Sequence, residues 1–329
     1  MRNTRVAEVA SVREAGIQQR IGRFLQRLAD PGTGERGNLW GYVFVAPCMG
    51  FYIVFGVWIA IRGLLMAFQD YRWLVPETQC LFCTNGLGNY RELIHDAKFW
   101  HSFWVSLKFS LIYLPTTLTL ALVVAIMISR IEGGLLAAFY RVVVYLPVVL
   151  PISVAMLVWK QLFDPTVGYL NYFLRYIVGI RNPPYWFSWR WAFWTTMIPT
   201  IWRQFGYYTM LFLIGIYNIS QELYEAAAID GANAWQQHRY VTIPQLKPIF
   251  TLVLVLTAGL VSVMEEPMIL FQGGGPLDVI LTTGVYYYQT AFQLGDLRMG
   301  YAASMALILG IIHMALSGLV FKLMRTERA

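Results

Sequence analysis

One polar stretch of this chain reads Glu225-Ala226-Ala227-Ala228-Ile229-Asp230-Gly231-Ala232, and it lies between two strongly apolar segments. The stretch predicts a short helix over 222–228, because it combines good helix formers with acids in its first turns. Gly231 then supplies a break at which the backbone can take a positive φ. A second short helix is predicted over 232–240.

Val241-Thr242-Ile243-Pro244 follows the second predicted helix, and Pro248 comes four residues after Pro244. The two prolines mark the beginning of the next apolar segment. The whole stretch therefore predicts a helix–glycine–helix hairpin at a membrane surface. Its small residues let the backbone of another protein approach closely, so the hairpin is a candidate docking element.

The composition supports a membrane protein. Hydrophobic residues make up 57% of the chain and charged residues 13%, whereas soluble domains carry about 25% charged residues. A membrane-spanning helix needs roughly 20 residues, and the candidate spans are 42–61, 109–129, 142–159, 191–217, 249–264 and 301–321. The fifth is short unless it continues through Glu265 and Glu266 towards Phe271. The sequence thus predicts an all-α integral membrane protein with six transmembrane helices and the hairpin between helices 4 and 5.

Basic residues predict the orientation of these helices. With the N-terminus inside, the inner segments hold 14 Lys and Arg residues and the outer segments hold 7. Both termini and the hairpin are therefore expected to be cytoplasmic. The net charge of +7 reflects this topology, so no nucleic-acid partner is expected.

The predicted organisation has three parts. Residues 1–38 form a basic cytoplasmic segment, 39–323 form the membrane domain with the hairpin loop at about 219–248, and 324–329 form a cytoplasmic tail. The first segment is too polar for a secretory signal. Its residues 17–28 alternate apolar and Arg side chains at helical spacing, which indicates either an amphipathic helix on the inner leaflet or a disordered basic tail.

Sequence motifs for chemistry are absent. The chain has no GxxxxGK[ST] loop for ATP and no HExxH pair, so we expect no enzyme activity and no cofactor in this chain. Cys80 and Cys83 form a single CxxC in the first outer loop. One such pair cannot supply four zinc ligands, so no metal site is expected. A local disulfide and two free thiols both remain open.

The hairpin resembles the EAA loop of the ABC importer permeases, with His238 standing where that family usually has an aromatic residue such as Phe. Other segments extend the resemblance over about 40–323: they are Gly88-Asn89-Tyr90, Trp202-Arg203-Gln204-Phe205-Gly206, Gly273-Gly274-Gly275-Pro276 and Gly300-Tyr301-Ala302. The last two resemble the carbohydrate, maltose-like branch.

The resemblance implies a permease of a bacterial or archaeal inner membrane that forms half of a translocation pathway for a sugar or sugar-like solute. It implies a second similar permease, two ATPase subunits that bind ATP and Mg, and an extracytoplasmic solute-binding protein as partners. The residues expected to couple to the ATPase are Glu225, Ala226, Ala227, Asp230, Gly231, Ala232 and Pro244. A permease for a polyol, glycerol phosphate or another small polar solute is the nearest alternative. A secondary transporter is the more distant one, because it has no use for a cytoplasmic docking hairpin.

Four ionisable residues at membrane depth are candidates for the translocation pathway, since charges in lipid cost several kcal/mol: Arg203, Glu265, Glu266 and His313. Arg203 is expected to face a wet cavity or a carboxylate partner, or else to snorkel to an interface. Interfacial solvation is the alternative for the two glutamates, and hydrogen bonding between helices is the alternative for His313. The aromatic cluster 185–191 is expected to form an interfacial belt rather than a sugar platform.

Overall fold

The computed structural model describes residues 39–79, 84–131, 133–257 and 264–324. The described part is helical and contains no strand, so the predicted all-α class is confirmed. The basic segment 1–38, the end of the tail after Met324, and both Cys80 and Cys83 lie outside the described residues. The chain divides into two compact units, residues 1–63 and residues 64–329.

The first unit is a long apolar helical run. It contains α2 (Leu39–Tyr52), a π-helical turn (Ile53–Val57) and most of α3 (Trp58–Met66). The stretch Tyr42–Met66 is long and apolar enough to cross a membrane, and no residue of its most apolar window is buried within the chain. Such exposed apolar side chains are stable against lipid, which agrees with the first predicted span.

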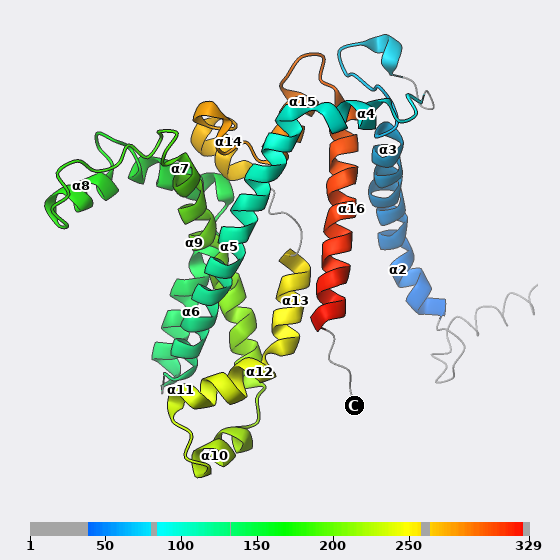
Figure 1. Cartoon of the computed structure of the whole chain (residues 1–329). Helices are drawn as coiled ribbons and strands as arrows, with labels where there is room; N and C mark the ends of the chain where they lie inside the picture. The colour runs from blue at the N-terminus through cyan, green and yellow to red at the C-terminus, as the bar shows by residue number, and fades with distance from the viewer. Residues whose placement is uncertain (1–38, 80–83, 132, 258–263, 325–329) are drawn as a thin grey trace, which may run out of the picture. The chain divides into compact units, whose positions relative to one another are not determined.

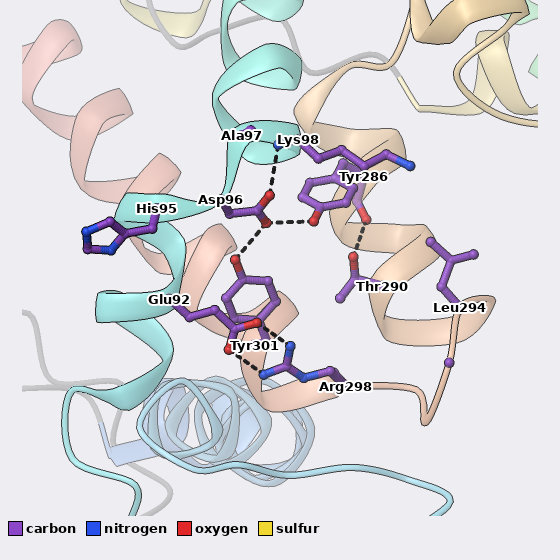
Figure 2. A pocket seen from close by; sticks show the side chains of 11 residues that line it. Glu92, His95, Asp96, Ala97, Lys98, Tyr286, Thr290, Leu294, Arg298 and Tyr301 are labelled. Atoms are coloured by element: carbon purple, nitrogen blue, oxygen red, sulfur yellow. Dashed lines mark hydrogen bonds and ion pairs between the residues drawn. The ribbon is translucent and has the colours of Figure 1, made fainter.

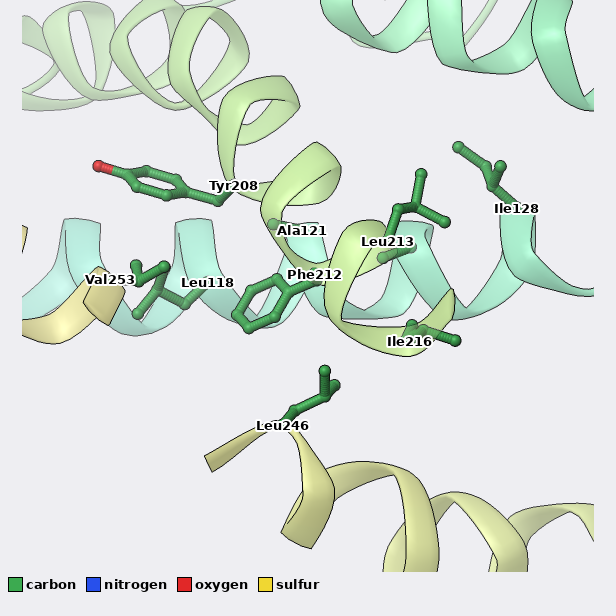
Figure 3. Close-up of a cluster of buried hydrophobic side chains, with 10 residues drawn as sticks. Leu118, Ala121, Ile128, Tyr208, Phe212, Leu213, Ile216, Leu246 and Val253 are labelled. Carbon is green, nitrogen blue, oxygen red and sulfur yellow. The ribbon is translucent and has the colours of Figure 1, made fainter. Parts of the chain in front are cut away.

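Two long helices form the core of the second unit. Apolar side chains of α5 (Ala97–Ser129) pack against α9 (Ala192–Tyr217), and Leu246 and Val253 complete the cluster (Figure 3). Its other members are Leu118, Ala121, Ala125, Ile128, Tyr208, Phe212, Leu213 and Ile216. Gly206 lets α9 approach α6 (Gly134–Val149) closely, because a Cβ there would lie 2.1 Å from the carbonyl oxygen of Val144.

The third predicted span, 142–159, is not one straight helix. It is divided between α6 and α7 (Ile152–Leu162), which are bent by 97° at the break. Pro151 explains the break, since proline lacks an N–H group and forces the residue before it into an extended conformation. Leu150 accordingly has a ψ of 133°.

The fifth apolar segment is also interrupted. Helix α13 (Lys247–Thr257) is followed, after residues 258–263, by the separate short helix α14 (Glu265–Phe271). A turn then follows, as predicted at Gly273–Pro276, with Gln272 and Gly275 at positive φ. It leads through the 3₁₀ turn Pro276–Asp278 to α15 (Thr283–Phe292) and α16 (Met299–Met324). The remaining short elements outside the hairpin are the 3₁₀ turn Pro76–Thr78, α4 (Gly88–His95) and α8 (Tyr169–Tyr176).

The described helices give three spans by length and apolarity, or up to five if each bent pair counts as one. The single helices are Tyr42–Met66, α5 and α16, and the bent pairs are α6 with α7 and Ala234–Gln245 with α13. Helix α9 has 26 residues but is less apolar, because it carries Arg203, Gln204 and several Thr and Tyr residues. Thus the multi-span helical architecture is established, and the count of six stays a prediction.

Trp186 does not belong to an interfacial belt, contrary to the sequence-based expectation for 185–191. It is buried, and its Nε1 donates a hydrogen bond to Oδ1 of Asn171 at 2.8 Å. Its ring contacts those of Phe163 and Trp191. A buried indole with a satisfied N–H group is a packing element. Tyr185 and Trp189 remain exposed.

Candidate functional site

The polar hairpin lies at one end of the second unit, away from α4 and α15 (Figure 1). Its first arm is α10 (Gln221–Ile229). Its second arm is α11 (Ala234–Gln237), which continues through the π-helical turn His238–Thr242 into α12 (Ile243–Gln245). The second arm therefore begins two residues later than predicted and extends beyond 240. Asn233 explains the start, because it forms a capping box with Gln236.

Gly231 has a φ of +81°, which confirms the predicted left-handed break. The N–H of Ala232 donates to the carbonyl of Ala227 at 2.9 Å, and the N–H of Gly231 donates to that of Ala228 at 3.0 Å. This pair of bonds is a Schellman motif, in which a glycine ends the helix without the strain that a Cβ would bring. Nothing lies within 4 Å of a Cβ built at Gly231, so the tip of the hairpin is open to a partner.

The residues predicted to couple to an ATPase lie on this hairpin. Ala227 and Ala232 are half-buried, and the others are exposed: Glu225, Ala226, Asp230, Gly231 and Pro244. Glu225 lies in the middle of α10, and the acid in the first turn is Glu222, so Glu225 does not cap this helix. Pro244 lies early in α12, inside the second arm, and does not mark the start of the next segment.

The hairpin also exposes large apolar side chains that the sequence pattern did not single out. Ile229 is 87% exposed, Trp235 71% and Tyr240 69%. These side chains lie on α10, α11 and the π-helical turn, and their exposure suits contact with a protein or a membrane. The sequence did not predict that these side chains are exposed, because apolar residues in short helices usually face the chain's own core.

Arg203 and Glu266 form an ion pair between α9 and α14. The Nη2 of Arg203 lies 3.6 Å from Oε1 of Glu266, and the side chains are 19% and 3% exposed. The expectation that Arg203 has a carboxylate partner is confirmed. The Nε of Arg203 is buried and has no hydrogen-bond partner in the described part of the chain.

The other two pathway candidates do not join this pair. Glu265 precedes Glu266 directly but is exposed. His313 is exposed on α16, so it does not pack inside this chain. The structure therefore brings together two of the four candidates, and the roles of all four stay predictions.

A second polar cluster lies at the opposite end of α5 from the hairpin, about 50 Å away for a helix of this length. The carboxylate of Asp96 accepts hydrogen bonds from the hydroxyls of Tyr286 and Tyr301 at 2.6 and 2.7 Å (Figure 2). It also accepts from the backbone N–H groups of Lys98 and Phe99 at 2.9 and 3.1 Å, and so caps α5.

Charged groups surround this cluster beside an open cavity of about 630 Å³. Arg298 donates to both carboxylate oxygens of Glu92, at 2.5 and 2.7 Å, and this bidentate contact lowers the pKa of Glu92 and raises that of Arg298. Burial alone would raise the pKa of Asp96, but the bonds from Tyr286, Tyr301 and the α5 backbone outweigh it and lower the pKa.

We expect Asp96→Ala to lower the free energy of unfolding by about 2 kcal/mol, because it removes a helix cap and two tyrosine hydrogen bonds. Asp96 stabilises the folded protein at pH values above the ordinary pKa of a carboxyl group. This stabilisation is lost as the pH falls through the lowered pKa that Asp96 has in the folded state. Thermal unfolding of the detergent-purified protein at neutral pH measures the effect. Asp96→Asn, which keeps a capping oxygen, should lose less; equal losses for the two variants would contradict the argument.

The fold and the site together are those of a multi-span helical membrane protein with a polar hairpin between α9 and α13. Residues 117–326 match the family described as binding-protein-dependent transport system inner membrane component, and the chain belongs to this family. The probable ABC transporter permease protein YesP of Bacillus subtilis is 32% identical over 293 residues, which cover 88% of this chain and 91% of YesP. The lactose transport system permease protein LacF of Rhizobium radiobacter is 28% identical, covering 88% and 95%.

A solved structure shows the same fold. The chain matches a bacterial ABC transporter involved in the import of the acidic polysaccharide alginate, with a TM-score of 0.76 and 21% identity, over 89% of this chain and 97% of that one. This likeness and the family together establish an ABC permease fold. The chain is accordingly a transport subunit and a multi-pass membrane protein.

Proposed function

We propose that this chain forms half of the translocation pathway of an ATP-driven importer for a sugar or an oligosaccharide. The observation that carries the proposal is the hairpin: a Schellman turn at Gly231 with an open tip, flanked by exposed small and apolar side chains. Such a surface is incomplete without a partner. The resemblance to the EAA loop makes that partner an ATPase subunit, which would bind ATP and Mg.

The remaining subunits follow from the family. A second, similar permease completes the pathway, a second ATPase subunit pairs with the first, and a solute-binding protein delivers the solute on the other side. In support, a similar solved complex holds the alginate transporter together with a periplasmic protein that carries an alginate pentasaccharide. Closure of the ATPases would move the hairpin as a rigid body and so rotate the packed helices α5 and α9.

The sugar class rests on the relatives. Among the similar permeases are those for lactose in Rhizobium radiobacter, for arabinooligosaccharides in Halalkalibacterium halodurans and for trehalose and maltose in Thermococcus litoralis. The Arg203–Glu266 pair supports a polar solute, because charged residues at membrane depth mark solute pathways. The test is uptake of labelled oligosaccharides by cells with and without this gene. If deletion abolishes uptake of a polyol or glycerol phosphate instead, the sugar assignment is wrong.

For topology we propose six spans with both termini and the hairpin in the cytoplasm. In a variant whose Cys48, Cys80 and Cys83 are replaced by serine, cysteines introduced near Gly34 and at Ala329 should react with a membrane-impermeant maleimide only after the cells are opened. A cysteine at Leu294, on the far side of the membrane in this arrangement, should react in intact cells. Labelling of the Ala329 position in intact cells would contradict the six-span arrangement.

A further inference from the structure

A chain of hydrogen bonds ties the hairpin to the end of α5. Arg130, which follows the last residue of α5, places its Nη2 2.5 Å from Nε2 of His238 and 3.5 Å from the carbonyl oxygen of Ala234. The other ring nitrogen of His238, Nδ1, lies 3.0 Å from Oγ1 of Thr242. The hydroxyl of Tyr224 on α10 lies 2.8 Å from the same Oγ1. Four side chains therefore join both arms of the hairpin to a core helix.

This arrangement requires a neutral His238. An arginine can only donate, so Nε2 must accept, and Nδ1–H then donates to the hydroxyl of Thr242. Protonation would place an N–H donor on Nε2 against the guanidinium and would set two positive charges at hydrogen-bond distance. Burial and the neighbouring Arg130 lower the pKa of His238 from its ordinary value near 6.5, so the pH must fall below that value before protonation opposes the contact.

Among the described residues, no carboxylate lines the polar hollow that this contact borders; Glu132, two positions after Arg130, lies outside the described residues. The hollow measures about 680 Å³, and the charged or titratable residues that line it with His238 are Arg130, Tyr217 and Tyr224. Glu222 and Glu225 on α10 are exposed and do not line it, and neither does Arg239 on the His238 turn, whose guanidinium lies over the ring of Tyr240. In the described part of the chain, Arg130 is thus the charge that His238 meets.

The surroundings favour a mechanical role for the contact. His238 and Thr242 are the first and last residues of a π-helical turn, and such turns occur frequently at functional sites. Thr242 is fully buried, whereas Arg130 is exposed. The contact is thus anchored on the hairpin side and accessible on the α5 side, where it can form and break.

We propose that Arg130 and His238 are positioning residues that transmit movement of the hairpin to α5, and that protonation of His238 breaks this transmission. The proposal rests on the proposed function, because it takes the hairpin to be the element that an ATPase moves. Breaking the contact leaves the hairpin able to bind the ATPase but free to move without α5. ATP is then hydrolysed with less solute taken up.

The experiment measures solute molecules taken up per ATP hydrolysed by the reconstituted complex between pH 5.5 and 8. For the unaltered complex we expect this ratio to be constant at the alkaline end and to fall reversibly as His238 is protonated. Arg130→Ala should have a ratio lower by about tenfold at every pH, which corresponds to the loss of about 1.4 kcal/mol of coupling. His238→Gln retains an acceptor and cannot titrate, so its ratio should stay high and independent of pH.

Control variants distinguish an error in this proposal from an error in the proposed function of the hairpin. Arg141→Ala removes an arginine whose Nε donates only to its own helix at Ala137, and it should behave like the unaltered complex. The double variant Arg130→Ala/His238→Gln should be no worse than Arg130→Ala alone, since the single variant already removes the contact between Arg130 and residue 238. A normal ratio in Arg130→Ala, or the same pH profile in His238→Gln as in the unaltered complex, overturns the proposal. If Gly231→Asp still uncouples transport in that case, the hairpin keeps its function and only the contact with α5 is wrong.

Discussion

Replacing Arg203 by alanine is expected to reduce solute uptake by tenfold or more while the subunits still assemble. The substitution leaves Glu266 buried at 3% exposure without its counterion, and a buried unpaired charge is strongly unfavourable. It also removes a charge at membrane depth that we assign to the solute pathway. Uptake in proteoliposomes and co-purification of the partner subunits measure the two effects separately.

A double variant distinguishes a structural pair from a pathway residue. In Arg203→Ala/Glu266→Ala neither charge is left unpaired, so the fold should recover much of the stability lost in the single variant. If Arg203 contacts the solute, uptake stays low although stability recovers. Arg190→Ala serves as the matched control, because Arg190 is an exposed arginine stacked on Trp189. Near-normal uptake in Arg203→Ala would remove Arg203 from the pathway.

Replacing Gly231 by aspartate is expected to separate ATP hydrolysis from transport. Its φ of +81° is unfavourable for a residue with a Cβ by about 1–2 kcal/mol, and the added side chain projects from the open tip where an ATPase would dock. We expect solute-stimulated ATP hydrolysis to fall by about tenfold or the ATPase to dissociate, while the membrane helices stay folded. The readouts are co-purification of the ATPase and solute-stimulated hydrolysis in the reconstituted complex.

Two further variants separate strain from docking. Gly231→Ala brings the strain of a Cβ at positive φ with little bulk, so it should uncouple less than Gly231→Asp. Gly86 also has a positive φ, of +57°, and has open space around its Cβ position, but it lies outside the hairpin. Gly86→Asp should leave coupling intact. Normal co-purification and stimulation in Gly231→Asp would remove the docking role from the hairpin.

The sequence predicted best what local chemistry determines. The left-handed conformation at Gly231 follows from a glycine between two short helices, and the turn at Gly273–Pro276 follows from three glycines and a proline. The bend between α6 and α7 also had a local signal in Pro151, but the uninterrupted apolar run concealed it. Hydropathy alone treats any long apolar segment as one helix, whereas a proline in its middle can divide it.

For residue pairs far apart in the sequence, the need for a partner could be predicted but not which residue the partner is. The cost of burying a charge indicated that Arg203 needs a partner, but nothing in the sequence identified Glu266, on another helix, in preference to Glu265. Asp96 had a partial signal, because an Asp directly before a long apolar helix is a typical cap. Its bonds to Tyr286 and Tyr301 depend on how α15 and α16 pack, which no local pattern encodes.

The most direct test of the central claim is uptake by proteoliposomes that contain this chain with its partner permease and ATPase subunits. We predict uptake only when ATP and Mg are on the side of the hairpin and the solute-binding protein with its sugar is on the other side. Uptake should be absent when ATP is replaced by a non-hydrolysable analogue, and an ion gradient should not restore it. Uptake driven by an ion gradient without ATP would contradict the account, because this chain would then be a secondary transporter.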